Sequence, residues 1–196
     1  IDRVAGAISD SVREHGAESV AFYLSGQLLT EDYYIANKLA KGFIGTPHVD
    51  TNSRLCMSSA VAAHKRAFGE DCVPGCYEDL ELADLLVLAG SNASWAHPVL
   101  YQRMSAARRQ GRRVVVIDPR KTATADLADL HLQLRPGTDT LLFNGLLVWL
   151  HDHGALAEDY LAEHCNGFEE TLAIARSCAP SVQAVARGCD LAVEEV

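Results

Sequence analysis

Hydrophobic positions along the chain alternate between helical spacing and short continuous runs, and this alternation predicts helices followed by strands. Apolar residues recur at helical spacing over residues 1–16, and a short apolar run over residues 19–24 is then typical of a buried strand. Further helices are predicted over residues 31–41 and 57–68, with a short strand at Val49 between them. The first part of the chain therefore alternates helix and strand.

Three further segments that are rich in apolar residues predict a buried parallel sheet. They cover residues 83–90, 114–117 and 129–134, and the first is apolar enough to be buried on both faces. A helix between the first two runs is expected to begin at Pro98 and to end near Gly111. Because strands and helices alternate, we predict an α/β fold with a doubly wound, mainly parallel sheet and helices on both faces.

The chain beyond Pro136 predicts a helical region. A helix that begins near Thr138 and ends at Gly154 is apolar on nearly all sides, so we expect it to be buried. Three shorter helices are expected over residues 158–164, 168–177 and 180–187. We therefore predict an α/β cofactor-binding domain over residues 1–135 and an acidic helical appendage, packed on it, over residues 136–196.

Composition and charge exclude several classes of protein. The 196 residues are 48% hydrophobic and 22% charged, which is typical of a globular protein. The net charge of −9 argues against a nucleic-acid partner, and the ten acidic and two basic residues that follow Pro136 carry −8 of it. The longest apolar run is shorter than the roughly 20 residues that a membrane span needs, so we expect no membrane association.

The turns after the predicted strands 83–90, 114–117 and 129–134 are candidates for ligand binding, because open parallel sheets bind ligands beyond the carboxyl ends of their strands. Glycines there let a ligand approach the backbone, and small polar or acidic side chains bind phosphate or ribose groups. The candidates are Gly90, Ser91 and Asn92 in the first turn, Asp118 and Arg120 in the second, and Gly137 and Asp139 in the third. These residue types also form ordinary turns. The absence of a G-x-G-x-x-G motif argues against a nicotinamide dehydrogenase.

Cys56 is a separate candidate for chemistry. It lies at the start of the predicted helix over residues 57–68, where backbone N–H groups stabilise a thiolate and Arg54 adds positive charge. Such a thiolate is a nucleophile or a soft metal ligand, whereas the alternative is an ordinary core cysteine. Most of the six cysteines are expected to be reduced and buried, and the pair Cys72 and Cys76 is too isolated to indicate a zinc or cluster site.

Five motifs occur in order along nearly the whole chain. They are Thr51 to Val61, Cys76 to Asp79, Gly90 to Asn92 with His97 and Pro98, Asp118 to Arg120, and Pro136 to Asp139. Together they resemble the molybdopterin guanine dinucleotide oxidoreductases, and within that family most closely the catalytic subunits of bacterial assimilatory nitrate reductases.

The resemblance implies a cofactor, a reaction and a set of site residues. Cys56 is implied to ligate molybdenum in a molybdenum bis(molybdopterin guanine dinucleotide) cofactor, where nitrate loses an oxygen atom and leaves as nitrite. Met57, beside it, favours nitrate reductases over formate dehydrogenases. The residues implied to lie at the cofactor are Gln27 and Asn52 near the pterin and metal, Gly90, Ser91, Asn92 and His97 along one dinucleotide, Asp118 and Arg120 at its nucleotide end, and Gly137 and Asp139 near the guanine.

The resemblance also implies parts that lie outside this sequence. Relatives carry a 4Fe–4S cluster on N-terminal cysteines and a C-terminal domain for the second dinucleotide. We therefore expect a cytoplasmic fragment, inactive alone, whose partners are those domains of the same polypeptide, nitrate and an electron donor. The alternatives are another member of the family, such as a formate dehydrogenase-like enzyme, and a non-catalytic α/β nucleotide-binding module in which Cys56 is only a core residue.

Overall fold

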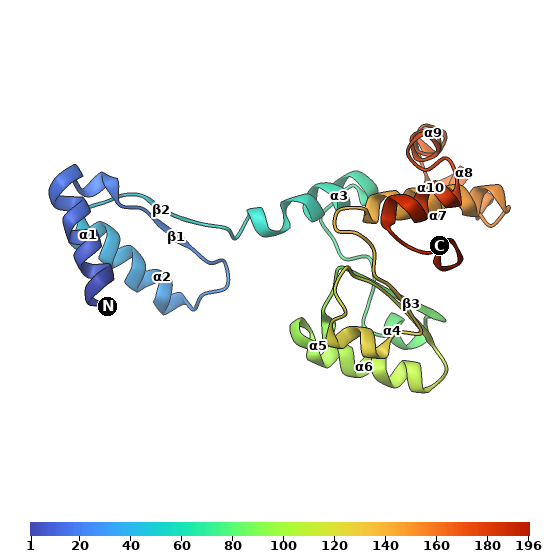
Figure 1. The fold of residues 1–196 in the computed structure, drawn as a ribbon, viewed down its shortest axis with the longest axis horizontal. Coiled ribbons are helices and arrows are strands. Elements are labelled where there is room, and N and C mark those ends of the chain that lie inside the picture. The colour runs from blue at the N-terminus through green and yellow to red at the C-terminus, as the bar shows by residue number, and fades with distance from the viewer. The chain divides into compact units, whose positions relative to one another are not determined.

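The computed structural model describes residues 1–196, and the chain forms two compact units, Ile1–Pro74 and Gly75–Val196 (Figure 1). The first unit contains the helices α1 (Asp2–His15), α2 (Thr30–Asn37) and α3 (Ser58–Phe68), the strands β1 (Phe22–Leu24) and β2 (Val49–Thr51), and the shorter helical segments η1 (Ala17–Ser19), η2 (Lys38–Ile44) and η3 (Leu55–Met57).

The two strands of the first unit pair in parallel, with Phe22 opposite Val49 and Leu24 opposite Thr51. They are connected by α2 and by η2, a π-helix that extends the predicted helix. Gly45 ends this helical run with a φ of 87°, in the left-handed region that favours glycine. Because the strands are parallel, the loops that follow them leave from the same edge of the sheet.

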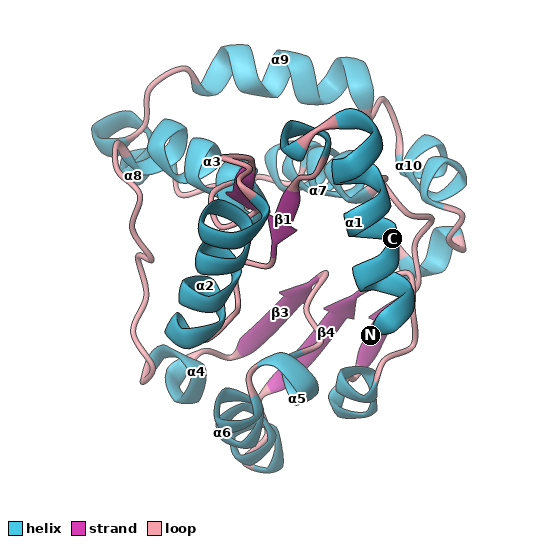
Figure 2. Cartoon of the chain, turned by 90° about the vertical axis from the view of Figure 1, so that its left-hand side faces the viewer, coloured by secondary structure: helices cyan, strands magenta, loops and turns pink.

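The second unit is built around a three-stranded parallel sheet in the order β3-β4-β5. In Figure 2 its strands β3 and β4 run side by side in the same direction. Its elements are the strands β3 (Leu85–Ala89), β4 (Arg113–Ile117) and β5 (Leu130–Leu132), the helices α4 (Asp79–Leu82), α5 (Ala93–Ala96), α6 (Pro98–Arg109), α7 (Asp139–Asp152), α8 (Glu158–His164), α9 (Phe168–Cys178) and α10 (Val182–Cys189), and the segments η4 (Ala123–Leu127) and η5 (Val193–Glu195).

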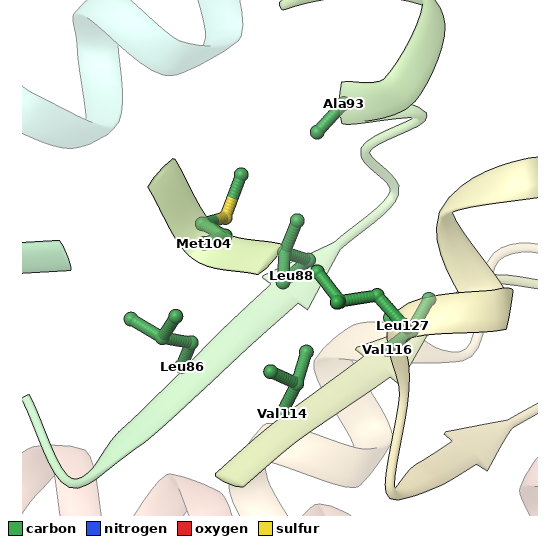
Figure 3. Packing of buried hydrophobic residues seen from close by; sticks show 7 residues of the cluster. All are labelled: Leu86, Leu88, Ala93, Met104, Val114, Val116 and Leu127. Carbon is green, nitrogen blue, oxygen red and sulfur yellow. The ribbon is translucent and has the colours of Figure 1, made fainter. Parts of the chain in front are cut away.

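One face of this sheet packs against α6 and η4. Leu86 and Leu88 of β3 and Val114 and Val116 of β4 alternate along their strands, so their side chains all point to this face. Figure 3 shows them beside Met104 of α6 and Leu127 of η4. The cluster fixes the ends of β3 and β4 at one level, with Ala89 opposite Ile117.

The opposite face packs against the C-terminal helices. Ile117 and Leu132 form a second core cluster with Leu142 of α7 and with Val185 and Cys189 of α10. Helices thus cover both faces of the sheet, and the predicted α/β class with a mainly parallel sheet is confirmed.

Close contact between α7 and α10 depends on two glycines. A Cβ at Gly145 would lie 2.7 Å from a methyl carbon of Val185, and one at Gly188 would collide with Leu141. These helices therefore pack directly on each other and on β4 and β5. The predicted division into domains 1–135 and 136–196 stays a prediction, although the helices beyond Pro136 belong here to the same compact unit as this sheet.

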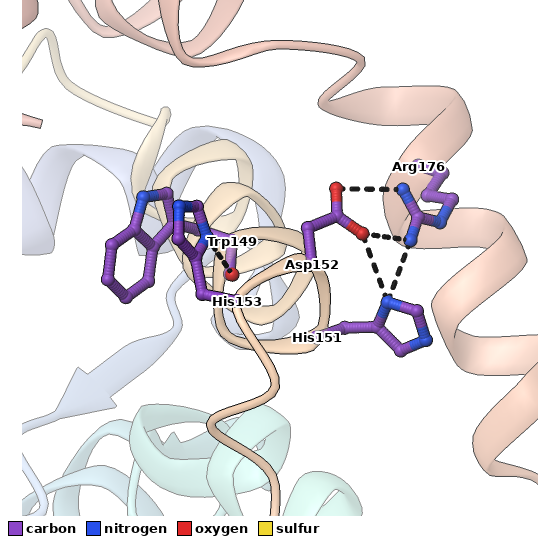
Figure 4. A network of polar contacts seen from close by, with 5 residues as sticks. All are labelled: Trp149, His151, Asp152, His153 and Arg176. Carbon is purple, nitrogen blue, oxygen red and sulfur yellow. Dashed lines mark hydrogen bonds and ion pairs between the residues drawn. The ribbon is translucent and has the colours of Figure 1, made fainter.

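A polar network ties α7 to α9 (Figure 4). Arg176 of α9 donates hydrogen bonds to both carboxylate oxygens of Asp152, and His151 lies 3.0 Å from one of them. This pairing lowers the pKa of Asp152 to about 2, chiefly through the hydrogen bonds from Arg176 and then through that with His151. Trp149 of α7 stacks on His153, which directly follows the helix, with 4.0 Å between ring centroids.

Three expectations about burial are wrong. Leu85 and Val87 of the edge strand β3 are each 50% exposed, because the cluster with α7 and α10 covers β4 and β5 instead. The helix α7 buries Leu142 and Val148, but Phe143 and Trp149 are almost half exposed. The apolar surface of α7 is therefore larger than the part of it that α9 and α10 cover. All six cysteines are free, but only Cys189 is buried.

None of the helices combines the length with the apolar character that a membrane-spanning helix needs.

Candidate cofactor-binding site

The turns that follow the three strands of the second unit meet at one pocket of about 260 Å³. The pocket lies beyond the carboxyl ends of β3, β4 and β5, where open parallel sheets bind ligands. Its lining residues are Ala89, Gly90, Ile117, Pro119, Leu134, Pro136, Gly137 and Asp139. The structure therefore brings together Gly90, Gly137 and Asp139, three of the residues singled out from the sequence.

Gly90 and Gly137 keep the pocket open. Gly90 has a φ of 60° and donates its N–H to the carbonyl of Ile117 at 2.8 Å, so the turn is fixed to the neighbouring strand. Gly137 has a φ of 81°, and no atom lies within 4 Å of where a Cβ would stand at either glycine. Both positions favour glycine for conformation, and both leave space for a ligand to approach the backbone.

Asn92 is held by side chains on both sides of its turn. Its Oδ1 accepts a hydrogen bond from the hydroxyl of Thr124 at 2.9 Å and a longer one from Ser94 at 3.2 Å. Its amide NH₂ makes no hydrogen bond within the chain, so this donor is free for a ligand. Ser91 precedes it in the same turn and is half-buried.

Asp118 follows β4 and is 9% exposed. One carboxylate oxygen of Asp118 accepts a hydrogen bond from the backbone N–H of Arg120 at 2.8 Å. The backbone carbonyl oxygen of Asp118 lies 2.9 Å from Nε2 of His131. The other carboxylate oxygen has no partner in the chain, so it is an acceptor available to a sugar hydroxyl or a base N–H. Arg120 itself is exposed.

His97 lies in a different place from the strand-end pocket. It precedes α6 and lines a separate surface pocket with Tyr77, Pro98 and Arg103. The guanidinium of Arg103 stands 5.6 Å over the ring of Tyr77 and pairs with Glu81 at 3.4 Å. The structure thus brings together the three strand-end turns but places His97 in a separate pocket, which shares no lining residue with the first.

In the first unit, Asn52 connects the two loops that hold the remaining candidates. Its Oδ1 accepts the backbone N–H of Gly26 at 2.5 Å, which fixes the loop that carries Gln27. Its carbonyl accepts the N–H of Cys56 at 3.0 Å. Gln27, Asn52 and Cys56 are therefore neighbours in space although the first two lie on different strand-end loops.

Cys56 and Met57 occupy the short helical segment η3, just before α3 begins at Ser58. Cys56 is exposed and Met57 is 46% exposed, so both side chains are accessible. The chain has no group of three or more His, Cys, Asp or Glu side chains that could hold a metal ion.

Sequence reasoning missed Thr124 and Gly26, which position the two asparagines. Thr124 is fully buried in the short helical segment η4, and its only local signal is that it stands between two alanines, Ala123 and Ala125. Gly26 had no signal of its own, because the close approach that requires it is made by a loop 26 residues away.

An open parallel sheet with glycine-lined turns at its strand ends is the arrangement of α/β proteins that bind ligands beyond the carboxyl ends of their strands. This chain belongs to the molybdopterin oxidoreductase family, whose family model matches residues 1–164. The enzyme class expected from the sequence motifs, a molybdopterin-dependent oxidoreductase, is confirmed by this membership.

The relatives of this chain are longer proteins. It is 53% identical over 98% of its length to a nitrate reductase of Shewanella frigidimarina and 54% identical over 96% of its length to one of Klebsiella oxytoca. The chain spans about a fifth of each (21%). More distant relatives include a periplasmic nitrate reductase and a formate dehydrogenase subunit. Acetylene hydratase from Pelobacter acetylenicus shares the fold, with a TM-score of 0.64 and 23% identity over 99% of this chain and 26% of its own.

Proposed function

We propose that this chain is the cofactor-binding part of a nitrate reductase and that its strand-end pocket holds the guanine nucleotide end of a molybdopterin guanine dinucleotide. The observation that carries the proposal is the convergence of the turns at Gly90, Asp118 and Gly137 on one edge of a parallel sheet. The similarity to two nitrate reductases over almost the whole chain supports the choice of reaction.

The residues of the second unit match the chemistry of a dinucleotide. Gly90, Ser91 and Gly137 let phosphate oxygens approach the backbone, and the free amide of Asn92 donates to them. The unpartnered carboxylate oxygen of Asp118 accepts from ribose or guanine, and Asp139 supplies a second acceptor at the pocket. The remaining assignments of the same kind, His97 along the dinucleotide and Arg120 at its nucleotide end, rest on the motifs alone.

In the first unit, the thiolate of Cys56 is the proposed ligand to molybdenum, with Met57 beside it and with Gln27 and Asn52 near the pterin. A soft sulfur ligand suits this metal, and the exposed thiol is accessible to it. When bound, the cofactor supplies the two electrons that convert nitrate and two protons to nitrite and water. Asn52 joins the backbone of Cys56 to the Gln27 loop, so the chain fixes the backbone position from which the thiolate extends.

The proposal includes parts outside this chain. We propose a 4Fe–4S cluster on a preceding segment, a following domain for a second dinucleotide, an external electron donor and a cytoplasmic location. The chain covers about a fifth of its nitrate reductase relatives, so the reaction belongs to the longer protein and the isolated chain is expected to be inactive.

A second candidate function is formate oxidation. A relative named as a formate dehydrogenase subunit is 34% identical over 86% of this chain, whereas Met57 after the cysteine favours nitrate. A non-catalytic nucleotide-binding module is the alternative in which Cys56 carries no metal.

The experiment that tests these functions uses the full-length enzyme purified from its own host. Molybdenum and acid-released GMP are measured per polypeptide, and turnover of nitrate and of formate is measured with a reduced and an oxidised dye, respectively. We expect both molybdenum and GMP, with turnover of nitrate. Absence of molybdenum would rule out both enzymatic functions, and turnover of formate alone would select the second.

A further inference from the structure

Thr124 is a fully buried polar residue whose hydroxyl reaches a turn far away in the sequence. Its exposed fraction is 0%, and its Oγ1 lies 2.9 Å from Oδ1 of Asn92, a residue 32 positions earlier. Oγ1 of Thr124 also accepts a hydrogen bond from the backbone N–H of Ser94 at 3.0 Å. The segment η4, which carries Thr124, therefore holds the beginning of α5 through two hydrogen bonds.

Counting donors and acceptors fixes the orientation of the Asn92 amide. Because Oγ1 of Thr124 accepts from Ser94, its own hydrogen is directed at an acceptor, and that acceptor is Oδ1 of Asn92. The hydroxyl of Ser94 donates to the same Oδ1 at 3.2 Å. With the oxygen of Asn92 occupied twice, only its NH₂ is left without a partner in the chain, as a pure donor.

We infer that Thr124 is a positioning residue that keeps the Asn92 amide turned with its NH₂ toward an anionic ligand, the pyrophosphate of the dinucleotide. The inference rests on the proposed function, since it names the ligand of that site. Without the Thr124 hydroxyl, the amide loses its stronger fixed donor and can turn over. It would then present its oxygen to a phosphate oxygen, and two acceptors repel each other.

The test compares Thr124→Val, which keeps the shape and removes the hydroxyl, with Thr124→Ser, which keeps the hydroxyl. In the full-length enzyme, Thr124→Val should retain GMP about tenfold less well during dialysis, as expected for one hydrogen bond to a charged group. Thr124→Ser should restore retention to the wild-type level. If Thr124→Val does not fold, Thr124→Cys replaces it, because a thiol is only a weak donor.

A double mutant separates positioning from a merely structural role. In an Asn92→Ala background, Thr124→Val should cause no further loss of GMP, because the group that it positions is absent. The side-chain ¹⁵N–¹H signals of Asn92 in the cofactor-free full-length enzyme should also shift in Thr124→Val and return in Thr124→Ser. Equal loss of GMP in both backgrounds, or unchanged Asn92 signals, would overturn the inference.

If the proposed function is wrong, the experiment gives a different result from the one expected when only the role of Thr124 is wrong. A wild-type enzyme that contains no GMP would overturn that function, and the role of Thr124 with it. If the wild type contains GMP and Thr124→Val retains it equally well, the function stands and the inference about Thr124 alone is overturned.

Discussion

The backbone N–H of Gly26 donates a hydrogen bond of 2.5 Å to Oδ1 of Asn52, and this contact joins the loops after β1 and β2. A Cβ at residue 26 would lie 3.0 Å from Cα of Ser53 and 3.1 Å from Oδ1 of Asn52. The approach is therefore possible only for glycine without a shift of one loop. Since Asn52 also holds the N–H of Cys56, a shift here moves the proposed ligand to the metal.

Gly26→Ala should lower the molybdenum content of the full-length enzyme, because the Asn52 loop must move to admit the methyl group. The overpacking should cost about 1–3 kcal/mol of unfolding free energy, measured by urea denaturation. Gly6→Ala is the control, since Gly6 lies on α1 with open space around it and alanine favours a helix. If the molybdenum content of Gly26→Ala stays at the wild-type level, the contact between Gly26 and Asn52 does not position the metal site.

Cys56→Ser should abolish nitrate reduction in the full-length enzyme while the protein stays folded. Serine has nearly the same size but offers a harder and far more basic oxygen, which is a poor substitute for a thiolate at molybdenum. Cys165→Ser is the matched control, because Cys165 is also exposed and lies after α8, outside the site. Circular dichroism checks folding, and turnover near the wild-type value would exclude Cys56 as the ligand.

Asp118→Ala should weaken retention of the guanine nucleotide. The substitution removes the free acceptor oxygen as well as the one that fixes the turn at Arg120. Hydrogen bonds to a charged group are worth about 1.5–3 kcal/mol each, so GMP content after dialysis should fall by at least tenfold. A full complement of GMP in this variant would contradict the placement of the nucleotide at Asp118.

Gly90→Val should remove the cofactor through both strain and bulk. Gly154→Val is a close control, because the φ angles are 60° and 63° and neither position has an atom within 4 Å of a Cβ. A left-handed conformation costs a non-glycine residue about 1–2 kcal/mol, so both variants should be less stable by a similar amount. Only Gly90→Val, at the pocket, should lose GMP. Equal retention in the two variants would show that nothing approaches the backbone at Gly90.

Asp152→Asn should destabilise the C-terminal helices in a pH-dependent way. Hydrogen bonds from Arg176 lower the pKa of Asp152 from 3.8 to about 2 in the folded chain. A lowered folded-state pKa stabilises the fold above the unfolded value of 3.8, and this contribution is lost as the pH falls from about 4 to about 2.

Urea denaturation near neutral pH should therefore find Asp152→Asn less stable than the wild type, and the difference should vanish near pH 2. Asp159→Asn, which removes an acidic residue of α8 without removing an ion pair, is the control. A difference that stays constant over this pH range would mean that the Arg176 pairing does not stabilise the fold.

The pattern of apolar residues along the chain was enough to predict the α/β class and the positions of the strand-end candidates. Continuous apolar runs at 83–90 and 114–117 became β3 and β4, because such runs are stable only where a sheet face is covered. Gly90, Asp118 and Gly137 could be singled out from their places after strands, since parallel strands end at one edge whatever their neighbours are.

Which of these residues meet, and which faces of the sheet are covered, depends on how distant segments of the chain pack together. His97 lies between α5 and α6, close to Gly90 in the sequence, yet the two residues line different pockets. The reason is that α5 and α6 turn the chain away from the strand ends. The exposure of Leu85 and Val87 depends on where α7 and α10 pack, which no local pattern contains. The orientations of Asn52 and Asn92 depend on Gly26 and Thr124, partners 26 and 32 residues away. These hydrogen bonds join segments that only the folded chain brings together.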